Sequence, residues 1–217
     1  MALAHSPKIV TDGLVLCLDA SDGKSYSGSG TTWTDRSGNG NNGTLINSPT
    51  FSNGIVEFDG ADEYVNVADS GTLDGFSSVT FEAWVKPDNN SGYRRIYDKN
   101  YTNTYNFSIS NTSTFYIYIN GNYSISSTTV DNNQWNHIVA TYDNTSAIFY
   151  KNGIVVNTNS FSHGAVGSNS ADLRIGTNHD SLSSKFYGDM GSCKMYNKAL
   201  TAAEVLQNYN ATKGRFS

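Results

Sequence analysis

The stretch QWNHIVATYDNTSAIFYKNGIVV, residues 134–156, decides the fold of this chain. Residues 135–142 alternate in hydrophobicity and are rich in aromatic and β-branched side chains, which is typical of a strand. Asp143-Asn144 and Asn152-Gly153 then each mark a turn, so the stretch predicts three consecutive antiparallel strands. Asn-Gly is the strongest short hairpin signal, because a type I′ turn requires φ > 0 at both central residues.

The same dipeptide recurs at Asn53-Gly54 and Asn120-Gly121, each time between apolar residues. Three such turns predict antiparallel β structure throughout the chain. Thirteen or fourteen strands are expected. They cover residues 8–20, 44–46, 55–58, 64–67, 79–86, 94–98, 105–110, 115–119, 135–142, 147–151, a segment from 154, 173–175, 185–187 and 190–196.

The predicted fold class is therefore all-β, with two antiparallel sheets packed as a jelly-roll sandwich and one short C-terminal helix. A single domain is expected over residues 1–217, with the sandwich at 8–200 and the helix at 202–209. The helix is signalled by Thr201-Ala-Ala-Glu204, a capping box in which Leu200 and Val205 are placed as the hydrophobic staple. The long Gly-rich loop at 21–42 holds Trp33, which we expect to anchor it on the body.

Composition excludes several classes of function. Charged residues are 15% of the chain and 26 residues are Asn, which suits a neutral, amide-rich surface. Net charge is −5 and no basic cluster exceeds Arg94-Arg95, so we expect no nucleic-acid binding. No run of 18 apolar residues is present, so no membrane insertion is expected. The start MALAHSPKIV lacks the apolar core of a secretion signal, so no signal peptide is expected.

The two cysteines, Cys17 and Cys193, lie near opposite ends of the chain. Two cysteines are too few for a disulfide scaffold or a zinc site, so two buried free thiols are expected. A sharper hypothesis is that the first and last strands pair and bring the two thiols together.

Six segments, in this order, carry a resemblance to a known family. They are FDGADEYVNV (58–67), SVTFEAWVKP (78–87), WNHIVATYD (135–143), YKNG (150–153), RIG (174–176) and KMYNKALTAAEV (194–205). Together they resemble the laminin-G-like/pentraxin-like branch of the concanavalin-A-like lectin/glucanase superfamily, over roughly residues 8–210. The resemblance implies two large sheets, one of them concave, in domains that mostly bind glycans or proteins and sometimes hydrolyse glycans.

Two further segments are similar to domains of tailed-bacteriophage structural proteins, namely residues 11–45 and the ending AEVLQNYNATKGRF (203–216). This similarity implies a virion surface protein of the capsid or tail.

Catalysis is not expected. Hydrolases of this architecture carry two carboxylates on one strand, in an E-x-D-x-E-like pattern. The chain has four glutamates, Glu57, Glu63, Glu82 and Glu204, and none forms that motif. His137 lies in mid-strand without a nucleophile elbow near it in sequence, which favours a core histidine. Glu82 is interpreted as a solvated or hydrogen-bonded strand residue.

Calcium is the cation usual in the family, and many relatives hold it with an Asp in a Gly-x-Ile-Asp-Glu-like run at the last strand. The matching run here is Gly188-Asp189-Met190-Gly191-Ser192, so Gly191 replaces that Asp. We expect no cofactor. Ca²⁺ held by Asp19, Asp59 and Asp189 is the alternative, because hard oxygen donors are its preferred ligands.

Sugar binding needs aromatic rings for stacking and amides or carboxylates for hydroxyl groups. The candidate ligand-binding residues fall into two sets. One set is Trp33, Tyr93, Arg95, Tyr97 and Tyr101, and the other is Asn178, His179, Asp180 and Tyr187.

The leading hypothesis is a non-catalytic, lectin-like adhesion module on a virion surface, with host-surface or other glycans and other virion proteins as partners. The alternative is a structural decoration or assembly protein that acts through protein–protein contacts, with a homo-oligomer left open. A glycan hydrolase is the weaker alternative.

Overall fold

The computed structural model describes residues 8–88, 92–180 and 184–216, and the three Asn-Gly dipeptides at 53–54, 120–121 and 152–153 form the tight turns that the sequence predicts. Both residues of each pair have positive φ: 50° and 78° at Asn53-Gly54, 51° and 79° at Asn120-Gly121, and 52° and 78° at Asn152-Gly153. These values are those of a type I′ turn, whose twist matches that of the flanking strands.

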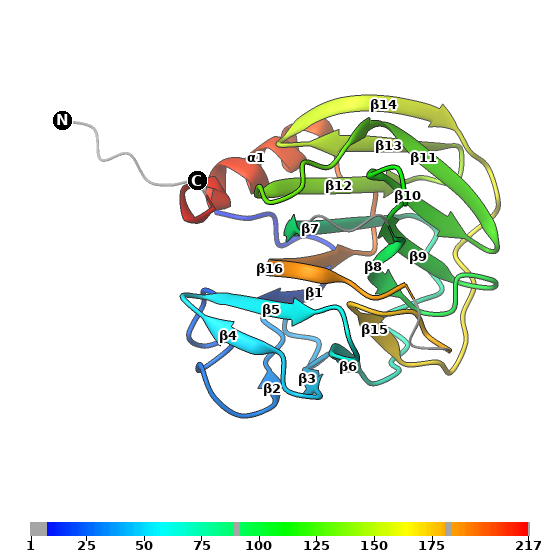
Figure 1. The fold of residues 1–217 in the computed structure, drawn as a ribbon. Helices are drawn as coiled ribbons and strands as arrows, with labels where there is room; N and C mark the ends of the chain where they lie inside the picture. The colour runs from blue at the N-terminus through cyan, green and yellow to red at the C-terminus, as the bar shows by residue number, and fades with distance from the viewer. Residues whose placement is uncertain (1–7, 89–91, 181–183, 217) are drawn as a thin grey trace.

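The strands form two antiparallel sheets of eight strands each (Figure 1). Sheet A has the order β14-β13-β12-β7-β16-β5-β4, with β1 also paired to β16. Its strands are β1 (Leu14–Asp19), β4 (Thr50–Ser52), β5 (Ile55–Asp59), β7 (Val79–Pro87), β12 (Asn136–Tyr142), β13 (Ser146–Lys151), β14 (Ile154–Ser160) and β16 (Tyr187–Tyr196).

Sheet B has the order β11-β10-β9-β8-β15-β6-β3-β2. Its strands are β2 (Thr32–Trp33), β3 (Gly43–Ile46), β6 (Tyr64–Val67), β8 (Arg94–Asp98), β9 (Tyr105–Ile109), β10 (Thr114–Ile119), β11 (Asn122–Thr129) and β15 (Leu173–Ile175). The all-β sandwich prediction is confirmed. The separate strand predicted at 185–187 was wrong, because Tyr187 is the first residue of β16.

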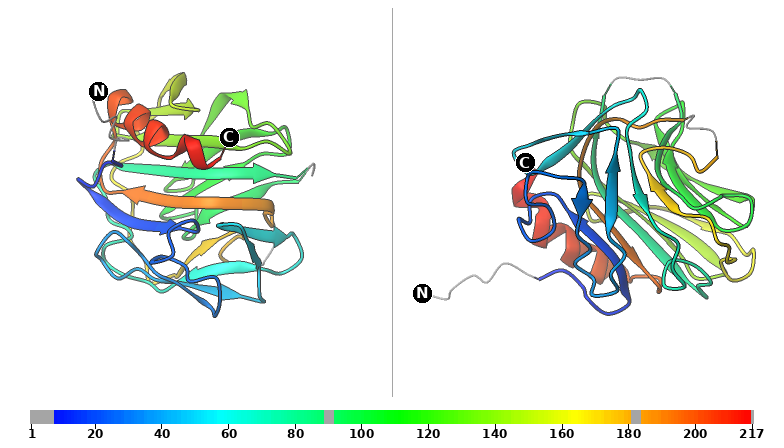
Figure 2. Two further views of the ribbon diagram at one scale, coloured as in Figure 1. Left: turned by 90° about the vertical axis from the view of Figure 1, so that its left-hand side faces the viewer. Right: turned by 90° about the horizontal axis from the view of Figure 1, so that it is seen from below.

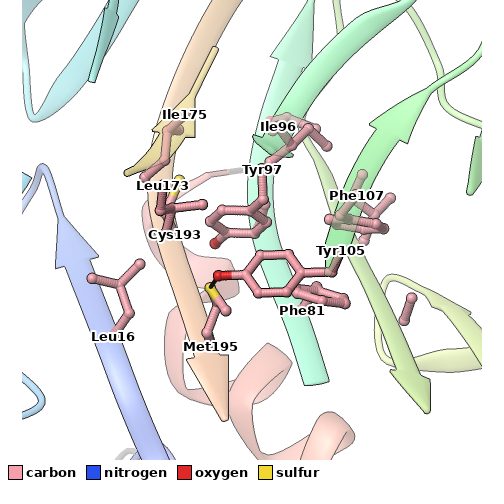
Figure 3. Packing of buried hydrophobic residues seen from close by; sticks show 14 of the residues in the cluster. Leu16, Phe81, Ile96, Tyr97, Tyr105, Phe107, Leu173, Ile175, Cys193 and Met195 are labelled. Atoms are coloured by element: carbon pink, nitrogen blue, oxygen red, sulfur yellow. Dashed lines mark hydrogen bonds between the residues drawn. The ribbon is translucent and has the colours of Figure 1, made fainter. Parts of the chain in front are cut away.

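Aromatic side chains fill the space between the sheets (Figure 3). Phe81 of β7 lies 5.0 Å from Tyr105 and 5.9 Å from Phe107 between ring centroids. Such contacts add to the large apolar area that each aromatic ring buries. Trp33 is fully buried in the same core, so the long loop is anchored by its tryptophan as predicted.

The C-terminal helix α1 (Ala202–Thr212) lies against the outer face of sheet A (Figure 2) and is followed by a short 3₁₀ helix, Lys213–Arg215. The predicted capping box at its start is present, and the helix continues three residues beyond the predicted end. Val205 and Leu200 pack with Val10 and Tyr196 in a second, smaller apolar cluster. No helix among the described residues is long and apolar enough to cross a membrane.

The first and last strands pair, as the sharper cysteine hypothesis required, but the thiols do not meet. Cys17 is opposite Lys194 and Cys193 is opposite Leu18 in the β1–β16 ladder. Adjacent residues in a strand point to opposite faces of the sheet. Cys17 therefore joins the cluster under α1 and Cys193 joins the core between the sheets, and both are buried free thiols.

Candidate functional site

Two rows of polar and aromatic side chains cross the outer face of sheet B. Residues directly opposite each other in an antiparallel ladder share a face. One row follows the pairing through β8, β9, β10 and β11 and consists of Arg95, Ser108, Tyr116 and Ile125. The next row consists of Asp98, Asn106, Tyr118 and Tyr123.

The β10–β11 hairpin explains how the tyrosines come together. Tyr116 and Tyr118 are two residues apart on β10 and therefore point the same way. The Asn120-Gly121 turn sets the register that places Tyr123 opposite Tyr118, with ring centroids 5.7 Å apart. Tyr116 and Tyr118 are themselves 5.8 Å apart.

Loops on either side of β8 add two further rings. Tyr93 meets Tyr116 edge-on at 6.2 Å, and Tyr101 meets Tyr118 at 5.0 Å between centroids. The rings enclose a hollow of about 450 Å³, which is within the size range of small-molecule sites. We call it the tyrosine groove. It is lined by Tyr93, Arg95, Tyr101, Ser110, Asn111, Thr112, Tyr116, Tyr118, Tyr123, Ile125 and Ser184.

Below the tyrosine rings, four side chains from β8 and β9 form a closed cycle of polar contacts. Arg95 donates through Nη1 to the hydroxyls of Ser108 at 3.3 Å and Tyr116 at 3.0 Å. Ser108 donates to Asn106 Oδ1 at 2.9 Å, and Asn106 donates in turn to Asp98 Oδ2 at 3.4 Å. Asp98 Oδ2 lies 3.4 Å from Nε of Arg95, which completes the cycle and balances the guanidinium charge.

Burial shifts the pKa values of the acidic groups in and beneath the groove. It raises the pKa of Asp98 to about 6, and Asp180 raises it further, while Arg95 acts in the opposite direction. Burial also raises the pKa of Tyr116 and Tyr118 above the usual value of 10, against the influence of Arg95. Both phenols are therefore neutral hydrogen-bonding groups at neutral pH.

Tyr97 was predicted to face a ligand together with Arg95, and this is wrong. A β-bulge lies between Arg95 and Tyr97, because Ile96 is an extra residue opposite the Ser108–Phe107 step. The bulge turns Tyr97 into the core (Figure 3). There its hydroxyl donates to the carbonyl of Glu82 at 2.9 Å. Asp98 takes the place on the groove face that simple alternation gave to Tyr97.

The other predicted ligand residues are distributed over four places. Tyr93, Arg95 and Tyr101 line the tyrosine groove. Trp33 is fully buried in the core and cannot contact a ligand. Asn178, His179 and Asp180 follow β15, and Asn178 donates to Asp180 Oδ1 at 2.9 Å.

Tyr187 does not belong to the groove. It is 39% exposed on β16, and its side chain packs beside Gly60.

The residues that sequence reasoning missed are mainly on β10 and β11. They are Tyr116, Tyr118, Tyr123 and Ile125 in the walls, and Asp98, Asn106 and Ser108 in the floor. The alternation of Tyr and Ile over 116–119, read together with the Asn-Gly turn, was the signal for the tyrosines. The floor residues carried no such signal, since they depend on which strands pair.

A buried lysine holds the loop that carries Tyr101. Lys99 is fully buried, and its ammonium contacts Asp69 at 2.5 Å and Asp74 at 3.2 Å. It also donates to the carbonyls of Ala171 and Asn169. Three loops are thereby joined immediately after β8, two residues before Tyr101.

The carboxylates considered for Ca²⁺ have other partners. Asp19 is paired with Arg215 at 2.7 Å and Asp189 with Lys86 at 3.1 Å, while Asp59 accepts from the amide of Ala61. Within residues 8–88, 92–180 and 184–216, no group of three or more His, Cys, Asp or Glu residues could hold a metal ion.

The ring of Phe216 explains why Gly191 stands where relatives have a ligand Asp. A Cβ on Gly191 would lie 2.1 Å from a ring carbon of Phe216, so the ring fills the space a side chain would need. Phe216 is held between Trp84 and Trp135, at 4.7 and 4.9 Å from their ring centroids.

Glu82 is buried beneath α1 in an ion pair and faces no second carboxylate across the strands. Its cross-strand neighbours are Val139 and Lys194. Lys194 lies 3.0 Å from Oε1, and Asn208 of α1 donates to Oε2 at 2.6 Å. Burial alone would raise the pKa of Glu82, but the nearby Lys194 ammonium and His137 imidazole outweigh it and lower the pKa to about 2. The sequence predicted a solvated or hydrogen-bonded carboxylate; Glu82 is hydrogen-bonded, but it is fully buried.

Comparisons with solved structures place this architecture beside known domains. Domain 4 of AbnA, a GH43 extracellular arabinanase from Geobacillus stearothermophilus, in complex with arabinotriose, is similar with a TM-score of 0.72 and 15% identity. The match covers 90% of this chain and 98% of that domain.

Two larger proteins contain a similar unit. The binding domain of Paraclostridial Mosquitocidal Protein 1 has a TM-score of 0.69 and 16% identity over 93% of this chain and 52% of its own. Trypanosoma rangeli sialidase in complex with sialic acid has a TM-score of 0.70 and 14% identity. That match covers 99% of this chain and 37% of the sialidase chain. At such identities the likeness shows the fold alone.

No curated protein matches the chain in sequence. Residues 59–206 match the family model of the concanavalin A-like lectin/glucanases superfamily, of the laminin G type. This segment is more than half of the chain and includes most of both sheets and the whole tyrosine groove. The chain is therefore a member of the concanavalin A-like lectin/glucanase superfamily.

Proposed function

We propose that this chain is a non-catalytic glycan-binding module and that its ligand binds in the tyrosine groove. The observation that carries the proposal is the set of five tyrosines around a floor of hydrogen-bonded polar groups. Tyrosine rings stack on the C–H faces of sugars, and neutral hydroxyl and amide groups bond their hydroxyls. The arabinotriose complex of the similar arabinanase domain supports a sugar ligand for this fold.

Binding is proposed to need neither catalysis nor a cofactor. Glu82 is fixed in its ion pair under α1, and the groove contains one buried carboxylate, Asp98, already paired with Arg95. A hydrolase of this kind would need two carboxylates facing the scissile bond.

The test is a glycan array followed by calorimetry on the purified chain. Tyr118→Ala is expected to weaken binding about tenfold, which corresponds to ~1.4 kcal/mol. The substitution removes the tyrosine ring that contacts three of the other four, those of Tyr101, Tyr116 and Tyr123. Tyr187→Ala is the matched control, since Tyr187 is an exposed tyrosine outside the groove. Equal losses in both variants, or no binding to any glycan, would contradict the groove as the site.

The same experiment also tests the Ca²⁺-dependent and the hydrolase alternatives. We expect binding to persist with a chelator present and no reducing sugar to be released from bound polysaccharide. Release of reducing ends would favour the hydrolase alternative.

The finer proposal is that the module works on a virion surface and is made in the host cytoplasm. Its support is the similarity of residues 11–45 and 203–216 to bacteriophage structural domains. An antibody against the purified chain should label the capsid or tail of intact particles in electron micrographs. Labelling of host cells but not of particles would contradict it.

A protein-contact role is the second candidate. The edge strand β14 exposes Ile154 by 68% and Val155 by 44%, and Leu206 of α1 is 44% exposed. Gly153, next to Ile154, lies close to Leu206, so the three apolar residues are near neighbours. Ile154→Lys should abolish any oligomer seen by light scattering if this surface mediates it.

A further inference from the structure

We infer that the tyrosine groove selects a neutral glycan chain of more than one sugar ring over a charged sugar. The inference rests on the proposed glycan-binding function and adds the class of ligand. It follows from the charge balance of the floor and from the length of the ring row.

The only cation lining the groove, among the described residues, is already neutralised. Nε of Arg95 faces Asp98 at 3.4 Å, and its Nη1 is used by Ser108 and Tyr116. A sugar carboxylate would have to displace Asp98 from its ion pair with Arg95, and the side chain of Asp98 is fully buried. Breaking a buried pair leaves an uncompensated charge, which is strongly unfavourable.

The charges around the floor add no positive excess. Asp180 raises the pKa of Asp98 through its negative charge, so a second negative charge lies near the floor. Arg174 is opposite Asp98 in the β8–β15 ladder, but its guanidinium stacks over Tyr64 at 5.1 Å and donates to the carbonyl of Asn178. Two arginines and two aspartates give no net charge to attract an acid.

The far wall offers neutral hydroxyl groups. Ser110 lies 2.9 Å from Thr112 and 2.7 Å from Thr114 between hydroxyl oxygens, at the edge of the groove. Each hydroxyl can both donate and accept, as can the hydroxyls of a neutral sugar. This wall therefore matches a polyol without requiring charge.

The row of rings is longer than one sugar. Tyr93, Tyr116, Tyr118 and Tyr123 follow one another at 6.2, 5.8 and 5.7 Å between centroids. A sugar ring is about the size of a phenol ring, so it covers one or two members of the row at a time. A chain of linked rings is needed to contact all four.

The test uses matched probes that differ only in charge or in length. Neutral oligomers of glucose, galactose and mannose are compared by calorimetry with oligomers of glucuronic, galacturonic and mannuronic acid, from one to four rings, at pH 7.5. Oligomers of xylose and arabinose complete the neutral set. We expect at least one neutral series to bind about tenfold more tightly than its acidic counterpart. Its affinity should rise from one ring to three and then level off.

Asp98→Asn provides the second arm. The substitution keeps the shape of the side chain and leaves Arg95 without its counter-charge, so binding of the acidic oligomers is expected to improve about tenfold. Asp131→Asn, whose exposed carboxylate pairs with Lys151 outside the groove, is the control and should change nothing. Circular dichroism confirms that both variants are folded.

The outcomes separate the two proposals. Acidic oligomers bound as tightly as neutral ones, or single sugars bound as tightly as trimers, would overturn the selectivity while leaving glycan binding intact. No binding of any oligomer by the wild-type chain would overturn the proposed function itself, and the selectivity with it.

Discussion

Glu82 shows how a single residue fixes the position of an entire helix. Its carboxylate contacts Lys194 of the neighbouring strand and Asn208 of α1, while His137 lies 3.2 Å away. Asn208 also accepts from the amide of Val10, so one amide side chain joins the segment before β1 to α1. The buried charge is tolerated here because Lys194 supplies the counter-charge and Asn208 donates a hydrogen bond to the carboxylate.

The folded pKa of Glu82 predicts acid sensitivity. Its pKa is about 2 in the folded chain against 4.5 as the ordinary value, so the pair stabilises the fold fully above pH 4.5. That contribution, about 3 kcal/mol, should be lost as the pH falls from 4.5 towards 2. Denaturant titrations from pH 7 to pH 2 measure it.

Glu82→Gln should flatten this acid limb and lower stability at pH 7 by ~3–5 kcal/mol, because Lys194 is left buried without a counter-ion. Glu57→Gln, at a half-buried site on β5, is the control and should retain the acid limb. An unchanged acid limb in Glu82→Gln would assign it to another carboxylate.

Asp98 has the opposite effect on the pH dependence of stability, because its pKa is raised in the folded chain. Its folded pKa of about 6 lies above the usual 3.8, so its protonated form favours the fold. This contribution is present below pH 3.8 and is lost as the pH rises through 6.

At the scale of elements, loops position the groove as much as strands do. Lys99 follows β8 and is bonded to groups from the 67–79 and 160–173 connections. Thr104 donates to the carbonyl of Lys99, which closes the short loop that bears Tyr101. The loop is rigid because a buried ammonium with several oxygen partners has one favourable position.

Lys99→Met should remove this anchor and leave Asp74 buried without its partner. We expect ~3–5 kcal/mol lower stability and weaker glycan binding through displacement of Tyr101. Lys151→Met, which breaks an exposed pair, is the control and should cost less than ~1 kcal/mol. A Lys99→Met chain with wild-type stability would show that the cluster is not an anchor.

At the scale of the whole molecule, two apolar clusters lie on opposite faces of sheet A. The larger one lies between the sheets and the smaller one lies beneath α1. Each contains one cysteine, and burial raises the pKa of Cys17 to about 11 and that of Cys193 to about 12. Neither thiol is exposed or ionised in the folded chain at neutral pH.

The two thiols should therefore report cooperative unfolding of both layers. In the native protein we expect no reaction of either thiol with an alkylating reagent within minutes. Both should react together in denaturant, at the midpoint found by circular dichroism. Mass spectrometry after brief labelling counts the modified thiols. Earlier reaction of Cys17 alone would mean that α1 and the N-terminal segment detach before the sandwich opens.

Local features of the sequence determined most of the secondary structure. The Asn-Gly turns, the alternation of 79–86 and 135–142, and the Thr201–Glu204 capping box depend on residues a few positions apart. The interactions that these features require are made within a short segment, so the hairpins, the strong strands and the start of the helix could be predicted from the sequence. The sandwich followed, because amphipathic strands must bury one face.

Tertiary structure alone decided the site. The bulge at Ile96 turned Tyr97 inward and Asp98 outward, which no alternation pattern reveals. Trp33 and Tyr123 are both aromatic residues near turns, but one is fully buried and the other is 62% exposed. The groove joins residues 93–125 with Ser184, and such long-range contacts depend on strand order and register. The physical reason is that a side chain's exposure is set by what packs against its face, which lies far away in the sequence.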